Sequence, residues 1–139
     1  MTAEIVRLTA DNAALLERVA EEVFDEDIVP SRLAAYLAEP THLMFVAVVD
    51  GEVVGQVAGV VHRHPDQATE LYIDNLGVAQ AHRRQGIARR LMAALLELGR
   101  SLGCEEAWVA TEVDNEPARN LYSAHAEGGT FAMMYEFDL

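Results

Sequence analysis

The 139-residue sequence contains no lysine, because all ten of its basic residues are arginine. This absence excludes two classes of site that need a lysine amine, the Schiff-base enzymes and the nucleotide-binding P-loop. The sequence also has a single cysteine, Cys104, which cannot form an intramolecular disulfide or supply a cluster of thiolate metal ligands. Its apolar neighbours favour a place in the core.

The sequence also lacks long apolar runs, repeats, low-complexity segments and linker-like stretches of Gly, Pro or Ser. No uninterrupted apolar stretch approaches the roughly 20 residues that a membrane-spanning helix needs. The first residues, MTAEIVRLTADN, do not combine a basic segment with an apolar run, as a secretory leader would. With 51% apolar residues, the chain is expected to form one soluble, cytoplasmic domain over residues 1–139.

Positive charge is scarce, because 23 acidic residues outnumber the ten arginines and give a formal net charge of −13. Such a charge repels nucleic acid and anionic membranes, so neither is a predicted partner. A charged partner should instead be a small cation. The alternative is that the acidity serves only solubility.

Hydrophobic periodicity predicts a mixed α/β chain. Strands are predicted at residues 4–9, on either side of the turn dipeptide Asp50-Gly51, at 70–78, at 105–113 and at 130–139. Helices are predicted after Asp11, at residues 31–38, from Ile87 to Gly103 and from Asn115 onward. The order of these elements predicts a mixed sheet with crossover helices.

For two of these elements, the sequence also predicts which side chains share a face. The helix capped by Asp11 should present an apolar stripe composed of Leu15, Leu16, Val19, Val23 and Phe24. The strand at 70–78 should place Leu71 and Ile73 on one face and Tyr72, Asp74 and Leu76 on the other.

The segment His62-Arg63-His64 contains two histidines, which are possible metal ligands. No further ligand follows them at a convincing spacing, so no metal site is predicted.

Four of the ten arginines lie in the stretch HRRQGIARR, residues 82–90, between a predicted strand and a predicted long helix. A glycine at the entrance of a helix lets several backbone N–H groups point into one concavity, and the helix dipole favours an anion there. Phosphate is the natural occupant, with Arg83 and Arg84 beside it, whereas Arg89 and Arg90 should lie beyond the first turn. The alternative is an ordinary helix start with solvated arginines.

The stretch LGVAQAHRRQGIARRLM resembles the acyl-CoA-binding signature of the GNAT superfamily of N-acyltransferases. The family pattern Q/R-x-x-G-x-G/A is met by Arg83, Gly86 and Ala88, and the hydrophobic-x-Val before it is met by Leu76 and Val78. A second family feature on a late helix is matched by NEPARNLY, which contains Asn115, Ala118, Leu121 and Tyr122. The resemblance implies the GNAT fold, a mixed central sheet with splayed strands flanked by about four helices.

The resemblance further implies acetyl-CoA as cosubstrate, with its pyrophosphate held by the backbone N–H groups of residues 84–88. The pantetheine arm would lie between the strand that ends at Val78 and the strand that begins near Ala107, with the Val78 amide facing the thioester oxygen. Asn115 is either a helix cap or a coenzyme contact. The implied coenzyme-binding residues are Leu76, Val78, Arg83, Arg84, Gln85, Gly86, Ile87, Ala88, Asn115 and Tyr122.

Acetyl transfer to an amine needs a base for the amine proton and an acid for the leaving thiolate. Asp74 is the first candidate for the base, because it precedes Val78 by four residues and should share a face with Tyr72 and Val78. Glu70, further back on that face, is the second candidate, acting through water. The alternative is that Asp74 is an ordinary solvated residue. Tyr122 is the candidate acid, because a phenol with a pKa of about 10 is protonated at neutral pH and so carries a proton that it can donate to the leaving thiolate.

ELYIDNLGVAQAHRRQGIA and the ending MMYEFDL are similar to the type-I aminoglycoside 3-N-acetyltransferases, which modify polycationic antibiotics and confer resistance. Two departures are Asp74-Asn75, where those enzymes carry Tyr-Asp, and His125-Ala126-Glu127, where the superfamily often has Leu-Gly. The alternatives are a polyamine or a peptide amine as acceptor, or an acyl-CoA-binding module without turnover. A homodimer is expected. The candidate acceptor-binding residues are Tyr72, Asp74, Asp25, Glu26, Glu112, Asp114 and Glu136, and Trp108, His62 and His64 are further candidates for lining the cleft.

Overall fold

Five strands form one sheet in which their spatial order follows their order in the chain. In this computed structural model, which describes residues 2–139, they are β1 (Glu4–Arg7), β2 (His42–Val49), β3 (Glu52–His62), β4 (Glu70–Val78) and β5 (Glu106–Val109). The strands β1 to β4 pair with one another in antiparallel fashion. The last strand, β5, pairs parallel with β4, because a helix connects the two. The predicted mixed sheet is therefore confirmed.

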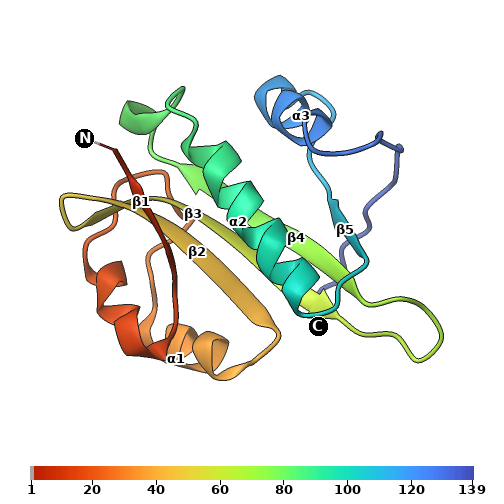
Figure 1. Cartoon of the computed structure of the whole chain (residues 1–139), viewed down its shortest axis with the longest axis horizontal. Coiled ribbons are helices and arrows are strands. Elements are labelled where there is room, and N and C mark those ends of the chain that lie inside the picture. The colour runs from red at the N-terminus through yellow and green to blue at the C-terminus, as the bar shows by residue number, and fades with distance from the viewer. Residues whose placement is uncertain (1) are drawn as a thin grey trace.

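The helices cover both faces of this sheet (Figure 1). The helical elements are α1 (Pro30–Ala38), α2 (Ile87–Ser101), α3 (Glu116–Ser123) and the 3₁₀ segments η1 (Ala10–Glu17) and η2 (Gln80–His82). α2 crosses one face over β2, β3 and β4 and buries Leu91 and Leu95 completely. Among residues 2–139, no helix combines the length and apolar character needed to cross a membrane.

The hairpin between β2 and β3 forms at the predicted dipeptide. Asp50 and Gly51 have φ angles of +50° and +79°, the left-handed pair that a tight type I′ turn requires. The turn leads into β3, whose residues Val53, Val54 and Val57 are fully buried because both faces of this central strand are covered. The prediction for this part of the chain is confirmed.

The first predicted helix differs from the observed structure. The segment is a 3₁₀ helix that begins after Thr9, whose hydroxyl accepts a hydrogen bond from the Asp11 amide, so Thr9 and not Asp11 is the cap. The predicted helical stripe is also broken, because Val19 forms an isolated bridge with Val53. The Ala20 amide donates a hydrogen bond to the Val53 carbonyl oxygen, and the Val53 amide donates one to the Arg18 carbonyl oxygen. These two hydrogen bonds hold residues 18–20 extended. Tertiary pairing therefore overrides the local helical periodicity.

The predicted terminal strand at residues 130–139 is wrong, because this segment has no regular secondary structure. Its large apolar side chains are exposed, with Phe131 at 84% and Phe137 at 83%. A strand needs a partner edge, and β5 is only four residues long, shorter than the predicted 105–113. The local preference of these residues for extended structure cannot replace the missing cross-strand hydrogen bonds.

A β-bulge interrupts β4 at Asp74. Ala58 of β3 pairs with Asn75 and the next residue, Gly59, pairs with Ile73, so Asp74 is an extra residue without a partner. A bulge of this kind reverses the alternation of side chains beyond it. The strand therefore does not keep one pattern of faces from Glu70 to Val78.

The bulge corrects the predicted faces of β4. Beyond it, Val78 pairs with Gly55, and a Cβ placed on Gly55 would lie 3.2 Å from Ile87 of α2. Directly opposed residues share a face, so Leu76 and Val78 lie on the α2 face. Leu71 and Ile73, which are buried before the bulge, lie on the same face. The predictions that Leu76 shares a face with Tyr72 and that Val78 shares a face with Tyr72 and Asp74 are wrong, because simple alternation cannot anticipate an inserted residue.

The segment after η1 closes over the other face of β4 through a buried amide. Gln56 is completely buried, and its Nε2 donates to the Val23 carbonyl oxygen (3.1 Å) and to Asn75 Oδ1 (3.0 Å). The backbone at Val23 comes so close to Gly77 that a Cβ there would lie 2.2 Å from the Val23 carbonyl oxygen. Only glycine permits this approach.

We expect Gly77→Ala to lower the free energy of unfolding by about 1–3 kcal/mol, because the added methyl group would overlap a backbone atom that cannot move alone. Gly128→Ala is the matched control, since a Cβ at Gly128 meets nothing within 4 Å. Urea unfolding of both variants measures the difference. Equal stability of the two variants would contradict the close packing of Val23 on β4.

Candidate functional site

The turn between η2 and α2 has the backbone conformation of an anion-binding loop. Arg84 and Gly86 have φ angles of +63° and +78°, and a Cβ on Gly86 would meet nothing within 4 Å. The glycine is therefore required by its φ angle and not by crowding. The first helical bond runs from the Arg90 amide to the Gly86 carbonyl oxygen (3.1 Å), so the amides of residues 87–89 have no partner within the helix.

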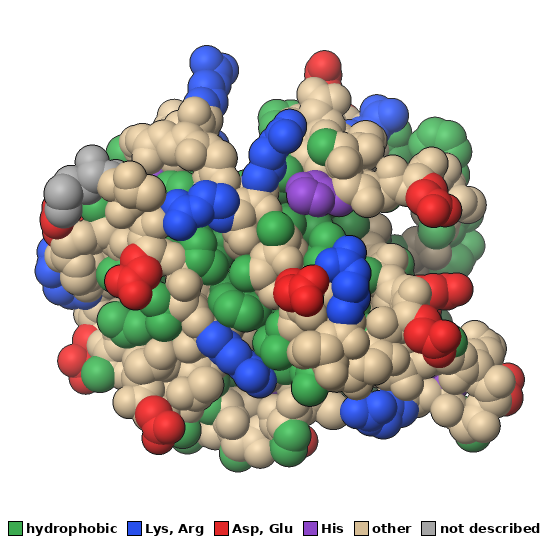
Figure 2. Space-filling view, in the orientation of Figure 1, with side chains coloured by type: hydrophobic (Ala, Val, Ile, Leu, Met, Phe, Trp, Pro, Cys, Tyr) green, Lys and Arg blue, Asp and Glu red, His purple; other side chains and the backbone are tan. Residues whose placement is uncertain are grey.

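A hollow of about 190 Å³ opens at this turn. It is lined by Val78, His82, Arg83, Arg84, Gly86, Ile87, Ala88, Arg89 and Leu121. In the space-filling view, a notch with arginine side chains on its rim separates the turn from α3 (Figure 2). The turn, the end of β4 and α3 therefore meet at one place.

Most of the predicted coenzyme-binding residues line this hollow, but Leu76, Gln85, Asn115 and Tyr122 do not. Arg89 lines it although the sequence suggested a position beyond the first turn, because α2 begins at Ile87 and Arg89 is its third residue. His82 also lines the hollow, although no motif in the sequence singles it out. Its place directly before the arginine pair was the available signal.

The two arginines of the turn are in different electrostatic situations. Arg83 donates from Nε to the Val78 carbonyl oxygen (3.1 Å) and pairs with Glu22 (3.4 Å), so part of its charge is compensated. Arg84 forms no ion pair with any residue between 2 and 139. Arg83 therefore links the turn to the loop that carries Glu22, whereas Arg84 keeps its full charge at the hollow.

The outer edge of β4 is open beside the hollow. Pairing between β4 and β5 ends at Ile73 and Val109, which leaves residues 74–78 without a strand on that side. The Ala79 amide donates inward to Val54 (2.9 Å), so by alternation the amides of Val78 and Leu76 point outward. Two backbone donors thus face the gap between the splayed strands.

Asp74 lies on the face opposite α2, beside two residues that the sequence analysis missed. The Tyr36 ring stacks on the His42 ring with centroids 4.9 Å apart, and the Tyr36 hydroxyl donates to the Leu43 carbonyl oxygen (3.0 Å). Burial and the nearby Asp74 charge raise the pKa of Tyr36. No local pattern links these residues, because α1, β2 and β4 meet only in the folded chain.

The pKa of Asp74 is raised above its ordinary value of 3.8 although the residue is exposed. Partial desolvation of the carboxyl raises it, and this effect exceeds the opposing effects of its own backbone N–H and of His42. The buried His42 Nδ1 has no hydrogen-bond partner among residues 2–139. The three side chains form a partly desolvated polar cluster on the face opposite α2.

Tyr72 and Trp108 form an aromatic platform on that same face. Their rings are stacked with centroids 4.3 Å apart, and Trp108 is 48% exposed. Tyr72 precedes Asp74 by two residues, so the platform continues from the bulge toward the start of β4. Glu70 lies further along, at the first residue of β4, where its carboxylate contacts His64 and not Asp74.

The remaining predicted residues lie on α3 and on exposed segments. Asn115 accepts a hydrogen bond from the Ala118 amide (3.2 Å), which confirms its role as a helix cap. Tyr122 is half-buried, and burial raises the pKa of its phenol. The predicted acidic residues are exposed on three separate segments: Asp25 and Glu26 before α1, Glu112 and Asp114 before α3, and Glu136 near the end of the chain.

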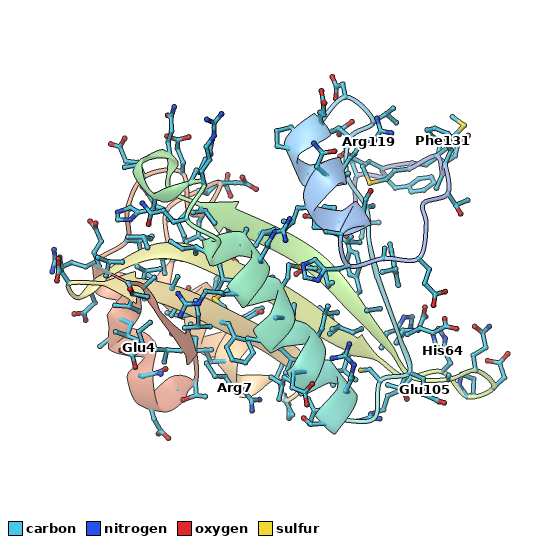
Figure 3. The ribbon with its side chains drawn as sticks, turned by 45° about the horizontal axis from the view of Figure 1, so that its top comes forward. Glu4, Arg7, His64, Glu105, Arg119 and Phe131 are labelled. Carbon is cyan, nitrogen blue, oxygen red and sulfur yellow. The ribbon has the colours of Figure 1, made fainter. Side chains whose placement is uncertain are left out.

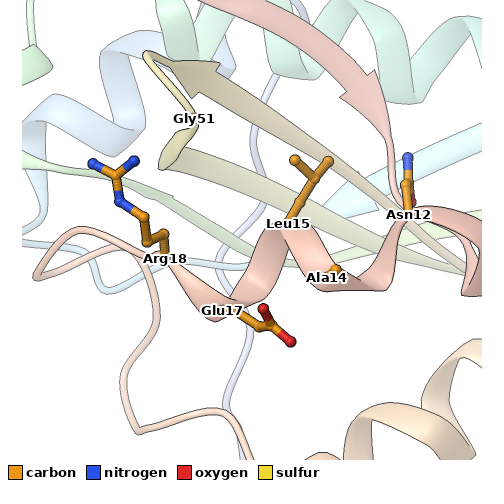
Figure 4. A pocket seen from close by; sticks show the side chains of 6 residues that line it. All are labelled: Asn12, Ala14, Leu15, Glu17, Arg18 and Gly51. Atoms are coloured by element: carbon orange, nitrogen blue, oxygen red, sulfur yellow. The ribbon is translucent and has the colours of Figure 1, made fainter.

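A larger hollow of about 330 Å³ lies elsewhere, between η1 and the β2–β3 turn (Figure 4). It is lined by Asn12, Ala14, Leu15, Glu17, Arg18 and Gly51. Arg18 crosses one side of it and donates to the Asp50 carbonyl oxygen (3.1 Å). This hollow contains none of the predicted site residues and no cluster of titratable groups, so size alone does not identify the functional site.

Comparison with known proteins gives consistent results. The sequence profile of the acetyltransferase (GNAT) family matches residues 10–126. N-alpha-acetyltransferase 30 of Schizosaccharomyces pombe is 35% identical over 78 residues, which cover 56% of this chain and 52% of the yeast protein. The match therefore spans about half the length of that curated relative.

Two solved structures resemble the whole chain. An aminoglycoside acetyltransferase from an uncultured soil metagenomic sample is 28% identical, with a TM-score of 0.84 and coverage of 100% of this chain and 99% of its own. The aminoglycoside N-acetyltransferase AAC(6')-Iy, in complex with a bisubstrate analogue, is 18% identical, with a TM-score of 0.82 and the same coverage. At that identity, the second likeness shows the fold alone.

We expect Asp74→Asn to stabilise the folded protein at neutral pH. A folded-state pKa above the unfolded value means that folding disfavours the charged carboxylate, so the penalty is present above the folded pKa and vanishes as pH falls below the unfolded pKa. The gain in melting temperature should be larger at neutral pH than at about pH 4.5. Asp138→Asn, which removes one charge from the exposed C-terminal segment, is the control. A gain that does not depend on pH would rule out desolvation as its cause.

Proposed function

The chain belongs to the acetyltransferase (GNAT) family, and we propose that it transfers the acetyl group of acetyl-CoA to an amine of a polycationic acceptor, an aminoglycoside. The observation that carries this proposal is the open outer edge of β4, which runs from Asp74 to the hollow at the start of α2. The end of the edge at the hollow suits an anionic pyrophosphate. The end at Asp74 has a carboxylate and the Tyr72–Trp108 platform, which suit a cationic amine.

The residues at the hollow fit coenzyme A. The backbone amides of residues 87–89, together with the helix dipole and Arg84, suit a pyrophosphate, and Gly86 provides the required turn. The outward amides of Leu76 and Val78 suit the extended arm of the coenzyme. When bound, acetyl-CoA supplies the activated acetyl group as a thioester. The Val78 amide would then donate to the thioester oxygen as negative charge develops on it.

Asp74 is the proposed base and Tyr122 the proposed acid. The raised pKa of Asp74 brings this carboxylate closer to neutral pH, which improves its ability to accept a proton from the acceptor ammonium group. Burial raises the pKa of Tyr122, so its phenol is protonated at neutral pH and would donate a hydrogen bond to the departing thiolate, although the raised pKa makes it a weaker acid than a free phenol. Glu70 takes no part in this proposal, because its carboxylate contacts His64.

Three observations favour an aminoglycoside as acceptor. The soil aminoglycoside acetyltransferase is 28% identical over essentially the whole chain. The net charge of −13 attracts an acceptor with several ammonium groups. The Tyr72–Trp108 platform beside Asp74 suits a cation held over aromatic rings. The 3-N position of acetylation, antibiotic resistance as its consequence, and a homodimeric assembly are parts of this proposal that rest on the sequence resemblance.

A peptide α-amine is the second candidate acceptor. The 35% identity to N-alpha-acetyltransferase 30 over 78 residues favours it. A polyamine is supported by charge alone. Both alternatives use the same coenzyme site and the same base, so they differ from the first proposal only in the acceptor.

We expect Gly86→Ala to weaken coenzyme A binding by about tenfold or more, because a left-handed φ is strained for alanine and costs roughly 1–3 kcal/mol. Gly103→Ala is a matched control, since Gly103 also has a left-handed φ of +93° and no atom within 4 Å of an added Cβ, but lies after α2. Calorimetric titration with coenzyme A measures both. Equal weakening in the two variants would indicate general destabilisation and not loss of the anion site.

We expect thiol release from acetyl-CoA to be most efficient, in kcat/KM, with gentamicin-like aminoglycosides and less efficient with spermidine or a short peptide. Asp74→Asn should lower kcat by about 100-fold or more, as loss of a general base does, and Tyr122→Phe should lower kcat with little loss of coenzyme affinity. Mass spectrometry and NMR of the product identify the acetylated nitrogen. A preference for the peptide would favour the second candidate. Tight coenzyme binding without turnover of any acceptor would instead indicate a binding module.

A further inference from the structure

Two histidines and a glutamate converge at the end of the β3–β4 hairpin. His62 ends β3 and faces Glu70, its register partner at the start of β4, and His64 follows two residues later. His64 Nε2 contacts Glu70 Oε1, and the two imidazole rings lie with centroids 4.1 Å apart. The potential ligand atoms of all three side chains lie within 4.8 Å of one another.

We propose that His62, His64 and Glu70 form a binding site for a late first-row divalent cation such as Zn²⁺, independent of acetyl transfer. Two imidazole nitrogens and one carboxylate oxygen are a common ligand set for this ion, with water in the fourth position. Neighbouring ligand atoms around a tetrahedral zinc ion stand about 3.3 Å apart, given zinc–nitrogen bonds of about 2.0 Å. The His62 side chain is exposed, so its ring is free to rotate toward that spacing.

The surroundings of the cluster favour a cation. Arg63 lies between the histidines in the sequence and is exposed, and its charge also opposes the rise in pKa that burial causes at the Cys104 thiol. Two exposed carboxylates add negative charge nearby, Asp66 in the same loop and Glu106, which is the register partner of Glu70 on β5. The net charge of the chain concentrates cations further.

The cluster lies at the opposite end of β4 from the hollow at the start of α2. In Figure 3, His64 is labelled at one end of the sheet beside Glu105, whereas α3 with Arg119 lies at the other end. β4 joins the two ends, because Glu70 is its first residue and Val78 its last. A cation here would hold loop 63–69 closed at the base of the strand that carries Tyr72 and Asp74.

Hairpin register explains why the sequence pattern did not reveal this cluster. Along the chain, His62 and His64 have no third ligand at a familiar spacing. Glu70 follows His64 by six residues, beyond an irregular loop, and only the pairing of β3 with β4 brings it opposite His62. The third ligand is therefore supplied by the fold.

Zinc titration of the full chain, purified in the presence of a chelator and then exchanged into chelator-free buffer, tests the proposal. We expect one Zn²⁺ per chain by calorimetry, a rise in melting temperature with zinc concentration, and shifts of the His62 and His64 ring signals in NMR spectra. His62→Asn should weaken zinc binding by about tenfold or more, since it removes one of three ligands. It should leave the metal-free melting temperature unchanged, because it keeps the contact between His64 and Glu70.

His125→Asn is the matched control, because His125 is an exposed histidine outside the cluster and tests adventitious binding. Zinc binding that is retained in His125→Asn but lost in His62→Asn and in Glu70→Gln supports the site. Binding that is equally strong in the wild type and His62→Asn would falsify it, and so would the absence of binding to the wild type. In either of those cases, His64 and Glu70 form only an ion pair.

Discussion

The bulge at Asp74 is the constraint on which the rest of the site depends. Without the extra residue, Leu76 and Val78 would turn away from α2, and the apolar contact between the end of β4 and this helix would be lost. With it, the α2 face stays apolar along the whole strand while Asp74 is released from the ladder. Pairing with β5 ends at Ile73, one residue before the bulge, so the same local irregularity accompanies the opening of the outer edge.

The buried Gln56 amide gives this irregular region a fixed geometry. Its Nε2 joins Asn75, directly after the bulge, to the Val23 carbonyl oxygen on the segment that precedes α1. One residue earlier, Glu22 pairs with Arg83 of the turn before α2. The segment at Glu22 and Val23, just before the acidic residues 25–27, is therefore held both to β4 and to the turn. Such links allow two backbone segments without regular structure to keep one arrangement.

The features that could be predicted from the sequence are those set by interactions between residues close together in the chain. The turn at Asp50-Gly51 and the helix from Ile87 follow from left-handed preferences and apolar periodicity, which act within a few residues. The bulge, the meeting of Tyr36 and His42 with Asp74, and the approach of Glu70 to His62 all depend on strand register. Register is a property of pairs of segments, so a single-strand pattern could not reveal it. The terminal strand failed for the same reason, since apolar content could be seen in the sequence but a partner edge could not.

Charge acts differently on the two proposed ligands. The net charge of −13 repels an anionic coenzyme at long range, but at physiological ionic strength this repulsion is screened beyond about 8 Å. At shorter range, the helix dipole, residues 87–89 with their amides, and Arg84 lie at the hollow, whereas Arg83 is partly neutralised by Glu22. Anion recognition at this turn therefore depends mainly on directed backbone donors, which salt weakens little. Attraction of a polycation depends on exposed carboxylates spread over several segments, so salt should weaken acceptor binding more than coenzyme binding.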